Sequence, residues 1–196
     1  MFGNPVENEK NWDFGYLKDI IKLDTKSIKP ANFDENDFYI GLEHIESNSG
    51  KILKKNKIKD ENIKSNKYSF NENHVLYGKL RPYLNKVALP SFNGVCSTDI
   101  IPILPITNFS NKLFIKYLLS LDYYIDLATE QSTGANLPRI SPKKLERFKI
   151  PKPPIEIQNK FAEIVKKVEK IKEYQNQSKI EINNLFNNLM QKSFKN

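Results

Sequence analysis

The chain has 196 residues, a length that suits one globular domain with an appendage. With 39% hydrophobic and 11% aromatic residues it can build a packed core, which excludes a disordered chain. Its one cysteine, Cys96, excludes an intramolecular disulfide framework, and one cysteine with two histidines argues against a zinc site. No secretory signal or long apolar run is present, so we expect a cytoplasmic protein without membrane contact.

The formal net charge of +8 is unevenly distributed along the chain. Residues 1–50 carry five lysines and ten acidic residues, or −5, whereas residues 51–154 carry 18 lysines and arginines against eight acids, or +10. Residues 155–196 carry eight lysines and five acids, or +3. A basic middle is expected of a surface that meets nucleic acid, but a lysine-rich composition on a solvated face explains the same charge. Charge alone does not separate the two.

The first third of the chain predicts short strands and turns. We expect residues 11–21 to be a short segment anchored on a core through Trp12, Phe14, Leu17, Ile20 and Ile21; stacking of Trp12 on a base is the alternative to its packing in the core. Residues 38–45 predict a strand that runs into a turn at 47–50. Residues 51–67 hold seven lysines and two acids, which is compatible with a hairpin or short helix facing phosphate and equally with a plain solvated loop.

The densest mixture of cationic and aromatic residues lies at 78–88. Gly78 allows close approach of the backbone to a ligand, Arg81 offers a planar fork for phosphate or guanine, and Tyr83 has a stacking face and a hydroxyl. This stretch is therefore a candidate contact with nucleic acid.

The following residues predict a buried strand, a helix and a loop. Residues 94–103 resemble a turn followed by a buried strand, and residues 111–127 have the apolar spacing of one helix. Small and polar residues from 128 onward lead to Arg139, as in a loop that enters a groove.

The last fifth of the chain predicts one long helix. Pro153 and Pro154 end the preceding segment and suit a first helical turn, and no proline or glycine follows them. Apolar residues then recur at alternating intervals of four and three, a period of about 3.5 residues that is typical of a coiled-coil seam. The seam consists of Ile157, Phe161, Ile164, Val168, Ile171, Gln175, Ser178, Ile182, Leu185 and Leu189. A single helix cannot bury such a seam, so we expect a partner helix; the alternative is a helix folded back on its own domain.

Sequence motifs for catalysis are missing. There is no GxGxxG or P-loop motif, so neither a dinucleotide nor a nucleoside triphosphate has an obvious cradle. The Pro153-Pro154 pair lacks the flanking residues of an adenine-methylase motif, and the carboxylates are scattered without a nuclease-like cluster. We therefore expect a protein that is not itself an enzyme.

Six segments, taken in order, resemble the specificity subunit of type I restriction-modification enzymes. They are LKDI (17–20) with Trp12, YIGLEHI (39–45) with GKI (50–52), LYGKLRPYLNK (76–86), CSTD (96–99), TGANLPRIS (133–141), and IPKPP (150–154) with Gln158. The family usually has Glu-Gln where this chain has Ile157-Gln158, with an acid one place earlier at Glu156. That acid still lies in the first turn of the helix, where the helix dipole favours negative charge.

The resemblance implies half of such a subunit. The family's subunits normally carry two target-recognition domains, each reading half of a split DNA site, and two long helices that pair antiparallel as the spacer. Here we expect an α+β fold with one recognition domain, residues 1–150, followed by one long helix, residues 151–196. The implied partners are double-stranded DNA, a second copy or another half-subunit, a methyltransferase subunit and a restriction subunit. S-adenosylmethionine, ATP and Mg²⁺ are implied for those subunits, and no cofactor for this chain.

The resemblance also suggests which residues meet DNA and how two helices pair. We expect phosphate or groove contacts from Lys79, Arg81, Lys86 and Arg139, with Tyr83, Thr133 and Asn136 as further candidates. Base-reading residues are expected in less recognisable segments such as 48–67. A symmetric antiparallel pair with its axis near residue 173 places Ile157 against Leu189, Phe161 against Leu185, and Ile164 against Ile182.

Three alternatives remain open at this point. One is a coiled-coil adaptor whose basic face reads no sequence, and a second is a self-sufficient nuclease or methyltransferase, which the missing motifs disfavour. The third is a truncated specificity subunit that pairs with a longer one.

Overall fold

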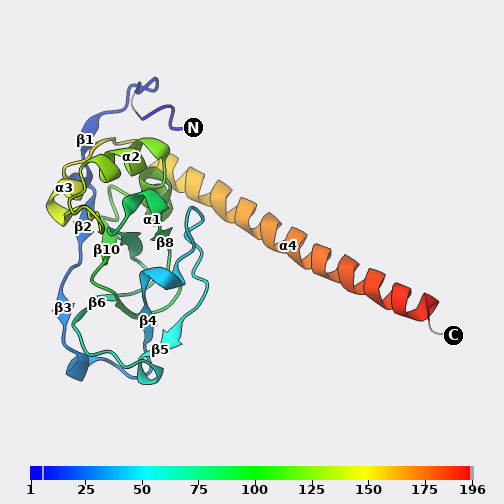
Figure 1. The fold of residues 1–196 in the computed structure, drawn as a ribbon. Helices are drawn as coiled ribbons and strands as arrows, with labels where there is room; N and C mark the ends of the chain where they lie inside the picture. The colour runs from blue at the N-terminus through cyan, green and yellow to red at the C-terminus, as the bar shows by residue number, and fades with distance from the viewer. Residues whose placement is uncertain (6, 195–196) are drawn as a thin grey trace.

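The computed structural model describes residues 1–5 and 7–194 and shows a globular domain from which one long helix projects (Figure 1). The strands are β1 (Phe14–Tyr16), β2 (Ile21–Leu23), β3 (Ser27–Ile28), β4 (Phe38–Ile40), β5 (Asn56–Lys57), β6 (Lys67–Phe70), β7 (Val75–Gly78), β8 (Val87–Ala88), β9 (Gly94–Cys96), β10 (Ile100–Pro105) and β11 (Lys149–Pro151). The helices are α1 (Lys112–Leu119), α2 (Asp122–Glu130), α3 (Pro142–Glu146) and α4 (Ile155–Ser193). Single turns of 3₁₀-helix occur at Leu17–Asp19, Pro30–Asn32, Leu42–His44, Ile58–Asp60 and Pro82–Leu84.

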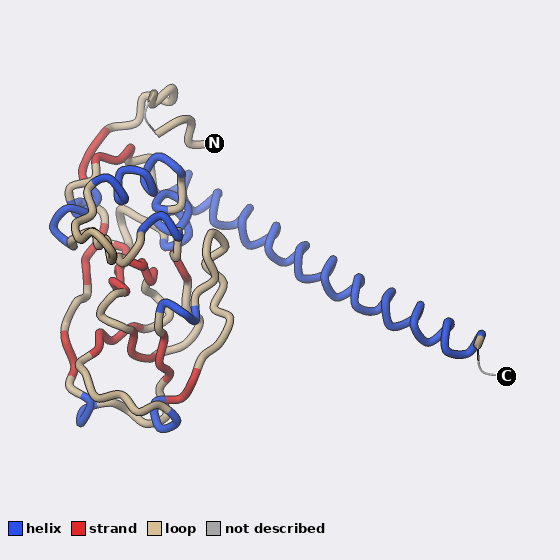
Figure 2. The backbone as a smooth tube through the Cα atoms, viewed as in Figure 1, coloured by secondary structure: helices blue, strands red, loops and turns tan. Residues whose placement is uncertain are grey.

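The strands form three small sheets joined by long loops (Figure 2). One pairs β1 with β11, a second has the order β2-β10-β7-β8, and the third has the order β3-β6-β9-β4-β5. All neighbouring strands are antiparallel except β4 and β9, which are parallel. The expected α+β class is confirmed.

The sheet containing β7 separates two hydrophobic cores because its side chains alternate between its faces. Val75 and Tyr77 point into the larger core, with Phe114 of α1 and Leu145 of α3. The intervening Leu76 points into the smaller core, formed with residues of the third sheet. The helices therefore cover one face of the β7 sheet, and the third sheet covers the other.

The helix expected at 111–127 is two helices, α1 and α2, so the expectation of one continuous helix is wrong. The break falls at Ser120 and Leu121, and Leu121 has extended backbone angles (φ −73°, ψ 140°). In one straight helix Tyr124 would point about 80° away from the direction of Phe114, because each of the ten intervening steps turns the helix by about 100°. The break instead buries both side chains, which are 1% and 3% exposed.

Two further segments differ from the sequence-based prediction. The strand expected at 38–45 stops at Ile40, and the chain turns into Leu42–His44, where His44 Nδ1 accepts a hydrogen bond from Gly41 N at 3.2 Å. The lysine-rich segment 51–67 is mostly loop, with β5 as an edge strand beside β4. No hairpin forms within 51–67, and the helix there is limited to the single 3₁₀ turn at Ile58–Asp60.

Helix α4 has 39 residues, about 58 Å at a rise of about 1.5 Å per residue. Only its first turns pack on the domain: Gln158, Ala162 and Val165 are buried, and every side chain from 166 to 194 is exposed. The alternative of a helix folded back on its own domain is therefore wrong. Within the described residues, no helix has the length and apolarity needed to cross a membrane.

The junction between domain and helix lies at residues 152–154. Strand β11 still belongs to the domain, because Ile150 pairs with Gly15 of β1, and α4 begins at Ile155. The division into residues 1–150 and 151–196 stays a prediction.

Candidate nucleic-acid interface and pairing helix

The turn at Pro82–Leu84 presents two candidate DNA-contacting residues on a rigid base. Arg81 and Asn85 flank it, both in the left-handed backbone region (φ +51° and +45°). Pro82 is buried, whereas Arg81 and Tyr83 are exposed, Tyr83 by 50%. The tight turn thus points the guanidinium and the phenol ring outward.

The second candidate segment, 133–139, is tied to this turn through backbone hydrogen bonds. Arg81 N donates to Pro138 O at 2.7 Å, and Ile140 N donates to Lys79 O at 3.1 Å. The Arg81 side chain also reaches the segment, since Nη2 donates to Asn136 O at 3.5 Å. Two motifs more than 50 residues apart in the sequence therefore form one surface.

The segment 133–139 is itself a closed loop. Thr133 N donates to Arg139 O at 3.0 Å, and Arg139 N donates to Thr133 O at 2.9 Å. Between them, Gly134 has φ +106°, a conformation that glycine adopts without strain. Thr133 and Asn136 are exposed on this loop. Together with Arg81 and Tyr83 they form the exposed part of the candidate surface.

Arg139 is engaged within the domain. Its Nε donates to Asp99 Oδ1 at 2.8 Å and its Nη2 to Asp99 Oδ2 at 3.0 Å, while Nη1 donates to Leu137 O at 3.2 Å. The hydrogen bonds to Asp99 raise the pKa of the Arg139 guanidinium above the ordinary value for arginine. This two-point ion pair fastens the loop to the residue that precedes β10, so Arg139 has a structural role whatever it contributes to DNA binding.

The two lysines of the predicted set differ from each other. Lys86 Nζ donates to Leu42 O at 2.8 Å, so its ammonium joins two segments of the domain. Lys79 is half-buried, and its backbone N donates to Asp99 O at 2.9 Å. Contact of all seven candidates with DNA stays a prediction, and the geometry favours Arg81, Tyr83, Thr133 and Asn136.

The side chain of Gln158 fixes the base of α4. It is fully buried, and its Nε2 donates to Phe109 O at 3.0 Å and to Pro153 O at 2.8 Å. Its Oε1 accepts a hydrogen bond from Asn111 N at 3.0 Å. The amide thereby connects α4 to the start of α1.

The apolar seam of α4 begins at the domain and continues into solvent. Phe161 packs edge-on against Phe2 and Tyr117, with ring centroids 5.0 and 5.5 Å apart, so it contacts its own domain as well as being placed for a partner helix. Ile157 is half-buried. The other seam residues are exposed: Ile164, Val168, Ile171, Gln175, Ser178, Ile182, Leu185 and Leu189.

Sequence reasoning missed two residues that organise the site. Asp99 carries the ion pair that holds Arg139, and its position in the CSTD segment was a usable signal. Asn111 receives Gln158, and its place as the N-cap of α1, where its side chain accepts from Leu113 N, was a second signal.

Ligand groups for a metal do not gather in this domain. Among residues 1–5 and 7–194, no group of three or more His, Cys, Asp or Glu side chains could hold a metal ion. The two histidines are both buried and bonded through Nδ1 to nearby backbone, His44 to Gly41 N and His74 to Asn71 N.

Comparison with known proteins places this fold and surface in a family. The family model described as "Type I restriction modification DNA specificity domain" matches residues 9–184. The chain therefore belongs to the type I restriction-modification DNA specificity family. It is 28% identical to the specificity subunit of the type I restriction enzyme EcoDI from Escherichia coli, over 94% of this chain and 42% of that protein.

Solved structures have the same fold. A chain from a structural study of complex assembly and conformational transition of the type I R-M system matches with a TM-score of 0.70 and 23% identity. The HsdS subunit from Thermoanaerobacter tengcongensis matches with a TM-score of 0.67 and 21% identity. Each match covers 84% of this chain and 44% of the other, so this chain spans less than half the length of the relatives it matches.

Proposed function

We propose that this chain reads one half of a bipartite DNA target and positions an adenine methyltransferase subunit on it. The observation that supports this proposal most directly is the domain of a DNA specificity family joined to a helix whose apolar seam is exposed. The basic charge of residues 51–154 suits a partner of high negative charge. Since phosphate contacts position a protein while base contacts specify the sequence, Arg81 serves the first role in this account.

We propose further that two copies pair through α4 in antiparallel orientation. With the axis near residue 173, Ile164 meets Ile182, and both are exposed in the single chain, by 49% and 66%. Gln175 and Ser178 then lie in the layers beside the axis, where polar side chains fix the register of a coiled coil. Pairing would place one recognition domain at each end of the two-helix spacer.

A disulfide test distinguishes the orientations of the helices. The double variant Ile164→Cys/Ile182→Cys should give a covalent dimer on mild oxidation, whereas each single variant should remain monomeric on a non-reducing gel. These positions serve better than 161 and 185, because Phe161 also packs on its own domain. The native Cys96 is buried and does not compete. A dimer formed by Ile164→Cys alone would mean parallel helices.

The proposed complex leaves the chemistry to partner subunits. A methyltransferase subunit would bind S-adenosylmethionine, and a restriction subunit would bind ATP with Mg²⁺. This chain would recognise the DNA target without a cofactor or a catalytic step. Purified alone, it should neither methylate nor cleave DNA. Activity of the isolated chain would instead favour a self-sufficient enzyme.

A binding selection tests the reading of DNA. The complex of this chain with its methyltransferase subunit is incubated with random duplexes at moderate salt, and the retained DNA is sequenced. An interrupted motif is expected. Retention without any motif would support the adaptor alternative, and an asymmetric motif would indicate pairing with a different half or a longer subunit.

A further inference from the structure

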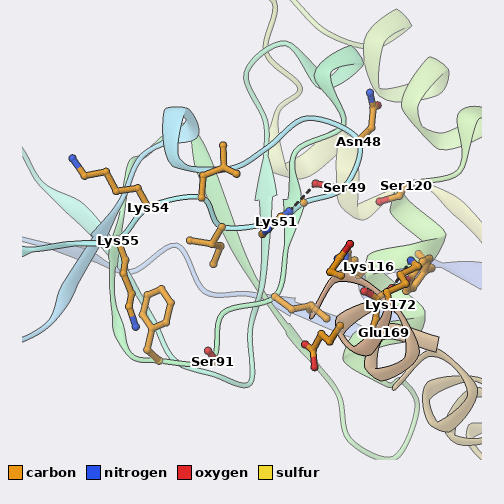
Figure 3. A pocket seen from close by; sticks show the side chains of 18 residues that line it. Asn48, Ser49, Lys51, Lys54, Lys55, Ser91, Lys116, Ser120, Glu169 and Lys172 are labelled. Atoms are coloured by element: carbon orange, nitrogen blue, oxygen red, sulfur yellow. Dashed lines mark hydrogen bonds and ion pairs between the residues drawn. The ribbon is translucent and has the colours of Figure 1, made fainter. Parts of the chain in front are cut away.

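A cleft outside the candidate surface lies between the loop at residues 48–55 and helix α4 (Figure 3). Its volume is about 970 Å³, and Lys116 and Tyr117 of α1 line it together with Ser120, which follows that helix. In Figure 3 the side chains of the loop approach from one side and those of α4 from the other. The cleft therefore lies where α4 leaves the globular domain, between the helix and the loop at 48–55.

The cleft carries more positive than negative charge. Five lysines and two glutamates line it, a formal excess of +3. Lys172 is paired with Glu169 at 2.8 Å. The remaining lysines, Lys51, Lys54, Lys55 and Lys116, form no ion pair with any carboxylate in the described part of the chain.

The loop that carries three of these lysines is held rigidly. Asn48 and Gly50 have left-handed backbone angles (φ +65° and +66°), and Asn48 N donates to Asn85 O at 3.0 Å. A side chain at Gly50 would collide with the carbonyl of Val87, so only glycine permits this close packing. A preformed wall of this kind loses little entropy when it binds a ligand.

Two of the lysines occupy positions that an anion would stabilise. The Lys55 ammonium lies over the rings of Phe38 and Phe92, 4.6 and 4.8 Å from their centroids, which fixes it at the wall of the cleft. Burial lowers the pKa of Lys116; Glu169 raises it by a smaller amount, and the positive charge of Lys172 lowers it further. An anion in the cleft would offset that desolvation and favour the charged ammonium.

The position of the cleft relates it to DNA between the half-sites. It is lined by Glu169, Lys172 and Glu173 of α4, so it lies on the side of the domain from which α4 projects. In the proposed antiparallel pair, the partner domain would lie at the far end of α4, so a duplex that contacts both domains would run along α4 and pass the cleft at its base. Lysine is depleted at protein–protein interfaces and ligand pockets are mostly apolar, so neither class fits this lining well.

We propose that this cleft binds backbone phosphates of the spacer DNA next to the half-site, through Lys51, Lys54, Lys55 and Lys116. The inference rests on the proposed DNA-reading function and adds a site to it. Its phosphate contacts are independent of base sequence, so they contribute affinity and salt dependence but leave the recognised motif unchanged. Base-reading residues of the segment 48–67 would then be residues other than Lys51, Lys54 and Lys55.

The test compares a cleft variant with a matched control in the assembled methyltransferase complex. The cleft variant carries Lys51→Gln, Lys54→Gln and Lys55→Gln. The control carries the same charge change at three exposed lysines, Lys22→Gln, Lys26→Gln and Lys29→Gln. These lie on or next to β2 and β3, on the opposite side of the domain (Figure 1).

Binding to a duplex with the selected motif is measured by fluorescence anisotropy over a range of salt concentrations. The slope of log K against log salt should fall by about 0.9 for each phosphate contact removed in the cleft variant, and stay unchanged in the control. Uncharged methylphosphonate linkages in the spacer should weaken binding by the wild type and have a much smaller effect on the cleft variant.

The outcomes separate this inference from the proposed function. A wild type that selects a motif, together with a cleft variant of unchanged slope, overturns the cleft alone. A wild type without sequence preference overturns the proposed function and the cleft with it. If the cleft variant instead fails to bind the methyltransferase subunit while the free chain retains its DNA affinity, the cleft is a protein-docking site and the inference is wrong.

Discussion

Gln158 in the first turns of α4 accepts a hydrogen bond from the backbone N of Asn111, 47 residues earlier, at 3.0 Å. The same amide donates to Phe109 O and Pro153 O, so one buried side chain joins α4, the start of α1 and the proline joint. Because α4 would set the separation of the two recognition domains, the rigidity of this junction determines how precisely that separation is kept.

Replacing Gln158 by alanine should therefore destabilise the domain. The change leaves Asn111 N and two carbonyls without their partner in a buried place, at a cost of about 1–3 kcal/mol. Urea unfolding followed by tryptophan fluorescence measures this, with Trp12 as the reporter. Gln177→Ala is the matched control, since Gln177 is exposed and bonds only to Glu181 on the same helix. Equal effects of the two substitutions would contradict the role of Gln158.

Arg139 and Asp99 should behave as a coupled structural pair. Arg139→Gln and Asp99→Asn each break the same two-point contact, so the double variant should lose less stability than the sum of the single variants. The pair is partly exposed, so we expect a small but measurable coupling energy from a double-mutant cycle in urea. Additive losses would show that the two side chains act independently.

Substitution of Arg81, unlike that of Arg139, should affect DNA binding and not the stability of the domain. The Arg81 side chain is exposed and has one long hydrogen bond, to Asn136 O at 3.5 Å, so Arg81→Gln should leave the unfolding midpoint nearly unchanged. The salt slope of DNA binding should fall by about 0.9 for the lost phosphate contact. An unaltered slope would remove Arg81 from the DNA interface.

The thiol of Cys96 should be unreactive in the folded protein. Its side chain is 0% exposed, and burial raises its pKa far above that of a free thiol. A raised pKa means that the thiolate, the reactive form, stays unpopulated even at pH 9, where a free cysteine is mostly ionised. Iodoacetamide labelling followed by mass spectrometry should therefore remain slow from pH 7 to 9 and become complete in urea. Rapid labelling of the native protein at pH 9 would contradict this burial.

A charge in the seam should separate the proposed pair. Ile182→Asp introduces two buried carboxylates in a symmetric dimer, one against each Ile164, and should weaken dimerisation at least about tenfold, which corresponds to about 1.4 kcal/mol. Analytical ultracentrifugation measures the change. Asn184→Asp, an exposed position outside the seam, serves as the control and should leave the dimer intact. Loss of dimer in both variants would indicate simple charge repulsion between the chains.

Local patterns predicted the parts of this fold that depend on local physics. The spacing of apolar residues from Ile157 to Leu189 predicted helix α4, because a helical period can be recognised in the sequence without knowledge of the tertiary contacts. Long-range partners were beyond that method: nothing near Arg139 in the sequence reveals that Asp99, 40 residues away, occupies its guanidinium. For the same reason the sequence around Lys86 does not reveal that its ammonium donates to Leu42 O, 44 residues away. The break between α1 and α2 arises from burial of Tyr124, a tertiary demand that apolar spacing does not contain.

The measurement that tests the central claim most directly is a methylome. This chain is expressed as the sole specificity subunit beside its methyltransferase subunit in a host without other such systems, and methyladenine is mapped across the genome. The account predicts methylation at one palindromic motif interrupted by a spacer of fixed length, as two identical half-readers on an antiparallel helix pair require. Assembly of the complex without any methylated motif would contradict it.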